Sequence, residues 1–296
     1  MNLTDLAPEL IEEILARCDP VDVSRIAQTS TQMRAMIYFA EDSSLWRDLY
    51  LNQFDDPRCC IGHDGTPQPQ PIDWKGDLQR IVRAQTVVQN WDILKPGELL
   101  SILQTLLALV CYVPPRLSAD HLWNGFKFSH NLLWILCEMG RKDHFLDRVA
   151  KRAEDGALTL HERQLGARLH TYYGLTNGDV SRMGVVKSLA FVYAEYEYDP
   201  DFNYGPFLPN GAVDWEIIQA VHHLLSMHIA PKDTAGQKDF TFLMNQMSAI
   251  MTQVVRPEGV VFDQEEDWAG VRGTWEISFC ICIADDENNE VPPGEW

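Results

Sequence analysis

The sequence predicts a mainly α-helical protein with a minor β element near its C-terminus. Between residues 8 and 228, apolar residues recur at three- and four-residue spacings, the period of an amphipathic helix. Pro- and Gly-containing breaks divide this pattern into short segments. Only residues 274–283 alternate apolar and polar side chains, as a half-buried strand does. Apolar residues make up 46% of the 296-residue chain, enough for a substantial core.

The N-terminal residues 8–50 are predicted to form short helices. Pro8 suits a first helical turn, where its missing N–H costs nothing. The apolar residues of this first helix that share one face are Leu10, Ile11, Ile14, Leu15 and Cys18. Asp19 and Pro20 then end this helix and start another, with Asp19 as N-cap. Val23, Ile26 and Ala27 continue a buried face, and Met33, Met36 and Ile37 form another. The segment closes with Leu45, Trp46, Leu49 and Tyr50.

A connector over residues 51–74 is predicted to lead into a helical domain over residues 75–260. Pro and Gly punctuate residues 55–73, where no apolar period survives. Helical patterns follow at residues 76–91, 97–113, 118–140, 143–156, 159–175 and 214–229. Asp214 is the expected N-cap of the last of these helices. No fixed repeat length recurs, so a repeat solenoid is not expected.

Residues 261–296 are predicted to hold the short β element and an acidic, disordered tail. The strand at 274–283 needs a pairing partner, since a lone strand is unstable. Residues 191–198, which fit either a strand or a helix end, and residues 260–263 are the candidates. The tail at 285–296 is acidic and contains proline, a composition typical of disorder.

The net charge and the cysteines of the chain indicate which classes of binding partner are disfavoured and in which cellular compartment the protein is expected. The net charge of −19 argues against nucleic acid and against an anionic membrane surface as ligands. The apolar run 99–113 is shorter than the ~20 residues that cross a bilayer. Seven cysteines without a visible signal peptide indicate free thiols in a reducing compartment, the cytoplasm or the nucleus.

Motifs for catalysis and cofactor binding are not found. There is no Gly-rich phosphate loop and no Gly-x-Ser-x-Gly elbow. His161 and Glu162 begin a zinc-hydrolase pattern, but Leu165 stands where the second histidine would be. The sequence therefore predicts no catalytic residue, no metal and no cofactor.

Two local groups of potential metal ligands have simpler explanations. His222, His223 and His228 do not share a helical face, so partial burial is expected for them. Cys59 and Cys60, with a histidine at position 63, lie in a loop and would need two more ligands from elsewhere in the chain.

The first fifty residues resemble an F-box. The motif elements are Leu6, Glu9-Leu10, Ile14-Leu15, Asp19-Pro20-Val21-Asp22, Ser30, Arg34 and Leu45-Trp46. Ala7 departs from the family, which usually has proline there, and the change bears on the adaptor contact and on the start of the helix. The resemblance implies a three-helix domain over residues 1–50 that docks on the Skp-type adaptor of a cullin–RING ubiquitin ligase.

The resemblance implies a set of adaptor-binding residues: Leu6, Pro8, Leu10, Ile11, Ile14, Leu15, Pro20, Val23, Ile26 and Trp46. If these helices dock on a partner, some of their apolar side chains should be partly exposed in the isolated chain. This exposure is expected for Leu6, Leu10, Ile11, Ile14 and Ile26. The alternative is an ordinary helical cap that residues 75–260 cover completely.

The later part of the chain is similar to the substrate region of fungal F-box proteins. This likeness rests on Tyr204-Gly205-Pro206-Phe207, on Asp214-Trp215 and on the stretch 270–275. The predicted contacts to a protein substrate are Phe202, Tyr204, Phe207 and Trp215. Aromatic residues in Pro- and Gly-containing loops also commonly plug a loop onto a core, and that alternative stays open.

The resemblance implies a non-catalytic substrate receptor of a Skp–cullin–F-box ubiquitin ligase. One alternative is an adaptor-bound scaffold with no role in ubiquitination. A second alternative is an enzyme or ligand-binding protein built on the helical domain, but no sequence motif supports it.

Overall fold

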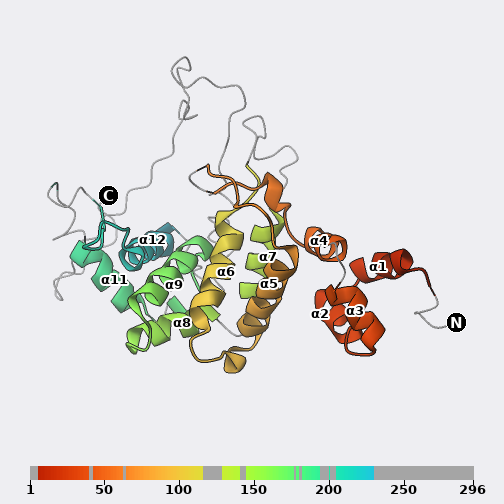
Figure 1. The fold of residues 1–296 in the computed structure, drawn as a ribbon. Helices are drawn as coiled ribbons and strands as arrows, with labels where there is room; N and C mark the ends of the chain where they lie inside the picture. Colours follow the sequence, from red (N-terminus) through yellow and green to blue (C-terminus); the bar gives the residue numbers. More distant parts are fainter. Residues whose placement is uncertain are drawn as a thin grey trace, which may run out of the picture.

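The computed structural model describes residues 6–39, 43–62, 65–115, 129–140, 145–176, 178–179, 182–193, 200 and 205–229. These residues form a mainly helical protein, as predicted (Figure 1). The expected strand at 274–283, its proposed partner at 260–263 and the acidic tail lie outside the described residues. Of the ambiguous stretch 191–198, the described residues 191–193 form the end of a helix.

Four short helices form the N-terminal end of the molecule. They are α1 (Pro8–Ala16), α2 (Pro20–Ile26), α3 (Thr31–Phe39) and α4 (Ser44–Leu51). Pro8 and Pro20 occupy the first turns of α1 and α2, as predicted. The Asp19 carboxylate accepts a hydrogen bond of 2.8 Å from the Val21 backbone N–H, which satisfies one of the free donors at the start of α2.

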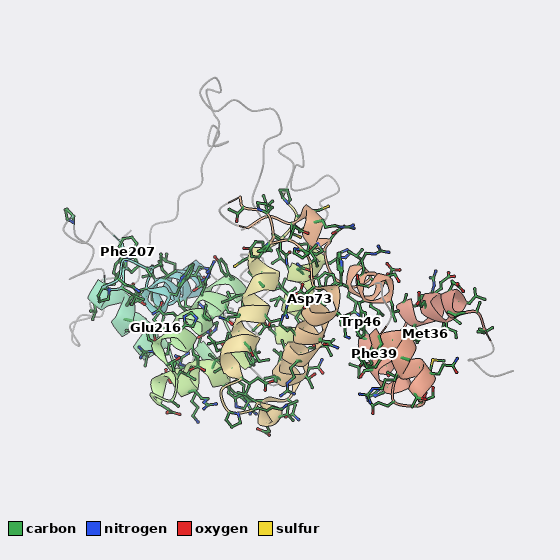
Figure 2. All side chains as sticks on the ribbon, viewed as in Figure 1. Met36, Phe39, Trp46, Asp73, Phe207 and Glu216 are labelled. Atoms are coloured by element: carbon green, nitrogen blue, oxygen red, sulfur yellow. The ribbon has the colours of Figure 1, made fainter. Side chains whose placement is uncertain are left out.

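Helix α4 joins the first three helices to the rest of the chain. The Trp46 indole N–H donates to the Ile37 carbonyl (2.9 Å), and the Asn52 amide donates to the Ala16 carbonyl (2.7 Å). On the other side, the Lys75 ammonium donates to the Tyr38 carbonyl (3.1 Å). Figure 2 shows Trp46 between the N-terminal helices and the helical body. One continuous apolar core therefore runs from α1 into the body.

The body consists of packed helices, and all but α11, which was not predicted, fall within the predicted segments or within a few residues of them. They are α5 (Trp74–Gln89), α6 (Leu99–Cys111), α7 (His130–Met139), α8 (Phe145–Glu154), α9 (Leu160–Tyr173), α11 (Met183–Val192) and α12 (Trp215–Ile229), with short 3-10 turns at Pro57–Cys59 and Trp91–Ile93. Helix α6 packs against α5, α7 and α9, and α12 packs against α9 and α11. Among the described helices, none combines the length and apolar character needed to cross a bilayer.

The segment between α4 and α5 is held against the body by polar contacts. Asp55 caps α7, because its carboxylate accepts hydrogen bonds from the backbone N–H groups of His130 (3.0 Å) and Asn131 (3.1 Å). Ile61 forms β-bridges with Pro67 and with Val113, which follows α6. Figure 1 places α1–α3 at one end of the molecule and α11 and α12 at the other.

Candidate functional site

Exposed apolar side chains gather on the N-terminal helices. Leu10 is 51% exposed and Ile14 is 44% exposed. Because four residues of α-helix make about one turn, the two side chains lie one above the other on the same face of α1. Val21 on α2 and Phe39 at the end of α3 are also exposed. Figure 2 shows Phe39 on the N-terminal helices, on the side nearer the helical body.

A neighbouring face of α1 is buried. Ile11 and Leu15 are 1% and 0% exposed, and α1 packs against α4. The expectation of partial exposure is confirmed for Leu6, Leu10, Ile14 and Ile26, but for Ile11 it is wrong. Ile11 belongs to the face that packs into the core with α4, a contact that helical spacing alone does not reveal.

The remaining residues of the predicted docking set divide between surface and core. Pro8 is exposed. Pro20, Val23 and Trp46 are buried, the last at 6% exposure. The predicted set therefore contains an outer group, which a partner can reach in this structure, and an inner group, which holds the helices together.

Ala7 does not prevent α1 from starting at Pro8. Its φ and ψ of −59° and 141° are ordinary for a residue that precedes proline. The Ala7 carbonyl accepts hydrogen bonds from the backbone N–H groups of Leu10 (3.0 Å) and Ile11 (3.2 Å), which begins the helix. The departure from the usual proline is thus compatible with the helix start.

The structure describes a helical protein whose short N-terminal helices carry exposed apolar side chains. Residues 3–38 match the F-box domain. The chain therefore contains an F-box at its N-terminal end. No curated protein and no solved structure matches it. The similarity of the later part to fungal F-box proteins stays a prediction.

The aromatic residues predicted to contact substrate fall into three situations. Phe202 and Tyr204 lie outside the described residues. Phe207 is 49% exposed and forms an antiparallel β-bridge with Val213, next to a hydrogen bond from the Asp214 N–H to the Pro206 carbonyl (2.7 Å). Trp215 is half-buried at the start of α12.

The surroundings of Trp215 are those of a packed side chain. Its ring centre lies 5.7 Å from that of Tyr172, and the Arg168 guanidinium carbon lies 5.0 Å from its ring centre. Asp214 caps α12 as predicted, accepting from the Glu216 N–H at 3.0 Å. Trp215 therefore fixes the start of α12 to α9, whereas Phe207 is the more accessible of the two aromatic side chains.

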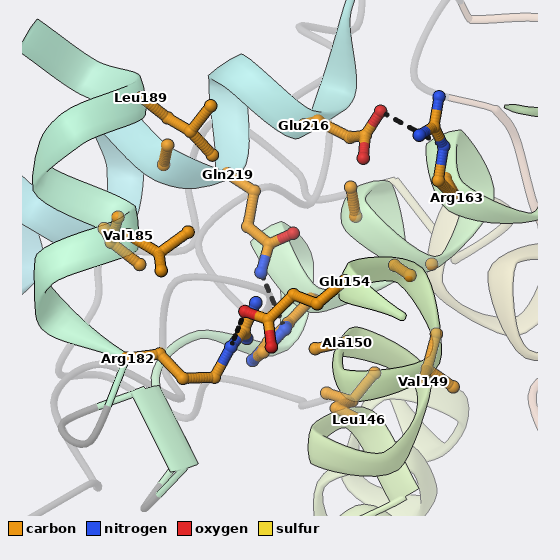
Figure 3. A pocket seen from close by; sticks show the side chains of 16 residues that line it. Leu146, Val149, Ala150, Glu154, Arg163, Arg182, Val185, Leu189, Glu216 and Gln219 are labelled. Carbon is orange, nitrogen blue, oxygen red and sulfur yellow. Dashed lines mark hydrogen bonds and ion pairs between the residues drawn. The ribbon is translucent and has the colours of Figure 1, made fainter. Parts of the chain in front are cut away.

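A cavity between α8, α9, α11 and α12 was not predicted. Its volume is about 130 Å³, and it is open to solvent. Figure 3 shows its charged side chains, with Arg182 paired to Glu154 (2.6 Å) and Arg163 paired to Glu216 (3.7 Å). Val185 and Leu189 form an apolar wall. Four separate helices contribute to the lining, so no local sequence pattern marks it.

Of the histidines and cysteines considered from sequence, His223 and Cys60 are buried, His222 is half-buried and Cys59 is exposed. Burial lowers the pKa of His222 to about 4, and burial also lowers the pKa of His223. Cys60 is buried, which raises the pKa of its thiol, whereas Cys59 is exposed. The histidine at position 63 lies outside the described residues.

Proposed function

We propose that this chain is the substrate-recognition subunit of a Skp–cullin–F-box ubiquitin ligase, working in the cytoplasm or the nucleus. The observation that carries the proposal is the F-box domain, with Leu10 and Ile14 exposed on its first helix. F-box proteins are in general non-catalytic receptors. Their family role is to hold a protein substrate close to the ubiquitin-charged enzyme that the cullin brings.

The exposed side chains suit burial by an adaptor. Fully burying one Leu or Ile contributes about 1.5–3 kcal/mol. Leu10 and Ile14 are about half exposed in the free chain, so an adaptor that covers them can still add roughly half of this free energy for each side chain. Association has a large entropic cost, so several such contacts are needed. We propose that the outer residues Leu6, Pro8, Leu10, Ile14 and Ile26 contact the adaptor.

The inner residues have a different part in the proposal. Ile11, Leu15, Pro20, Val23 and Trp46 are buried and set the positions of the helices that carry the outer group. Substituting an inner residue is thus expected to lower the stability of the fold and to affect adaptor binding only where the helices unfold, whereas an outer substitution acts on binding alone.

We propose that the protein substrate binds at the end of the molecule that carries α11 and α12. Phe207 is accessible there, and Trp215 opens α12 beside the cavity residues Glu216 and Gln219. Opposite charges and an apolar wall in one hollow fit a polypeptide segment with mixed side chains. This end lies far from the F-box in Figure 1, so both partners have room to bind together.

The test is co-purification with the adaptor and the cullin from cells. The variant Leu10→Asp/Ile14→Asp is expected to lose both partners. The control Leu133→Asp/Leu160→Asp changes side chains of similar exposure in the body and is expected to retain them. Adaptor and cullin binding that survives in the first variant would overturn the proposal.

A second measurement separates a receptor from a scaffold. The candidate substrates are proteins that co-purify with the Leu10→Asp/Ile14→Asp variant and whose cellular level falls when the wild-type chain is present. Their turnover is expected to require the cullin. Adaptor binding without cullin association or turnover would instead favour the scaffold.

A further inference from the structure

A buried group of three metal-ligating side chains lies between α9 and α12. His170 is in the last turn of α9, Asp179 is in the connection that follows, and His223 is in the middle of α12. They are 2%, 0% and 0% exposed. Each offers one ligand atom, and these three atoms lie within 4.8 Å of one another.

The distances between the donors suit a small cation. His170 Nε2 lies 3.0 Å from Asp179 Oδ2, and His223 Nδ1 lies 3.5 Å from Asp179 Oδ1. Zinc binds histidine nitrogen and carboxylate oxygen at about 2.0–2.2 Å in a tetrahedron, which separates neighbouring donors by roughly 3.3 Å. The two His–Asp distances are close to this separation, and the 4.8 Å limit for the whole group means that zinc would draw the donors slightly closer together.

The polar atoms of the cluster lack hydrogen-bond partners of good geometry. This holds for His170 Nε2, for Asp179 Oδ1 and for both ring nitrogens of His223. A buried polar group without a partner destabilises the folded state, because it has given up its hydrogen bonds to water. The two imidazoles also meet edge to face, with ring centres 4.5 Å apart, rather than in a mutual hydrogen bond. A cation bound between them would satisfy three of these atoms.

Supporting contacts orient the ligands in the manner of outer-shell groups in metal sites. Asp179 Oδ2 accepts hydrogen bonds from the Thr176 N–H (2.7 Å) and the Thr176 hydroxyl (2.9 Å). The Gln219 side-chain amide lies 2.8 Å from His170 Nδ1. The amide nitrogen faces the ring in this structure. Exchanging the amide nitrogen and oxygen, which have nearly the same shape, would let the oxygen accept the Nδ1 proton and would leave the Nε2 lone pair for a metal.

The guanidinium of Arg182 lies near the cluster and would repel a metal ion, but its charge is partly neutralised by Glu154. Arg182 Nη1 lies 3.6 Å from Asp179 Oδ1, and Arg182 Nε is paired with Glu154 at 2.6 Å. His170 also lines the cavity between α8, α9, α11 and α12, so the cluster lies beside a hollow that is open to solvent. We propose that His170, Asp179 and His223 bind a zinc ion that fastens α12 and the 174–182 connection to α9.

Metal analysis of the full chain, purified without a polyhistidine tag, tests this proposal. Stoichiometric zinc is expected in the wild type and is expected to be lost in His223→Gln and Asp179→Asn. The control His222→Gln, which changes the adjacent histidine, is expected to keep the metal. Gln219→Leu is expected to weaken zinc binding about 10–100-fold, the usual effect of removing an outer-shell partner.

A second measurement needs no variant that must fold. Adding zinc to the chelator-treated wild type should raise its unfolding temperature, and cobalt should give the visible spectrum of a tetrahedral nitrogen–oxygen site. The proposal is overturned if the wild type holds no stoichiometric zinc and shows no such shift. A thiolate-to-cobalt band would also overturn it, by assigning the metal to cysteines. Adaptor binding is a separate property, so either proposal can fail alone.

Discussion

Replacing Trp46 by phenylalanine tests whether this residue acts inside the protein or at the adaptor. The substitution keeps an aromatic ring beside Tyr38, whose ring centre is 5.6 Å away, but removes the indole N–H that donates to Ile37. An unsatisfied buried carbonyl costs about 1–3 kcal/mol, and the smaller ring leaves a void worth about 1 kcal/mol more. A loss of about 2–4 kcal/mol in the free energy of unfolding is therefore expected.

The assay is thermal unfolding of the purified chain together with adaptor titration well below the transition. For a chain of this size, the expected loss lowers the unfolding temperature by roughly 5–10 °C. Adaptor affinity of the folded variant is expected to stay within a few-fold of the wild type. Tyr38→Phe removes only a long 3.3 Å hydrogen bond to Ser24 and is expected to change stability little. An unchanged unfolding temperature with a large loss of adaptor affinity would refute the reasoning.

Three further predictions concern the body and the connecting segment. Two hydrogen bonds from Arg83 hold the pKa of Glu98 near 2, below its ordinary 4.5. Glu98→Gln should therefore lower the free energy of unfolding by about 1 kcal/mol at neutral pH. In acid unfolding, the difference between variant and wild type should disappear as the pH falls from 4.5 to 2. A difference that does not depend on pH would contradict this. Thr159→Ala removes the capping box of α9 and should cost ~1 kcal/mol in denaturant unfolding, with Thr159→Ser close to wild type; equal losses in both would argue against the cap. A thiol reagent should label Cys59 quickly and Cys60 only on unfolding, since Cys60 is buried with a raised pKa, and equal labelling rates in the native protein would contradict the structure.

The sequence located the helices well because their start signals are local. Asp19 and Asp214 cap the helices that their positions predict. Apolar spacing identified α6 and α9 to within a few residues at each end. These features depend on neighbours in the chain, which a single sequence displays.

Burial and tertiary sites depend on packing and were predicted less completely. Leu10 and Ile11 are adjacent apolar residues, yet one is half exposed and the other is buried against the core. From helical spacing, His223 could be compared only with His222 and His228 on the same helix, so no metal site was predicted there. Its actual neighbours, His170 and Asp179, are 53 and 44 positions away and reach it only because α12 packs on α9.

The most direct test of the proposed function is the dissociation constant between this chain and a Skp-type adaptor. With Leu10→Asp/Ile14→Asp, the lost apolar burial and the introduced carboxylates are expected to weaken binding by at least ~100-fold, about 2.8 kcal/mol. The unfolding temperature should remain near that of the wild type, because both positions are exposed. The control Leu133→Asp/Leu160→Asp should bind as the wild type does. A wild-type chain that fails to bind the adaptor, or a double variant that binds equally well, would contradict the docking role of this F-box.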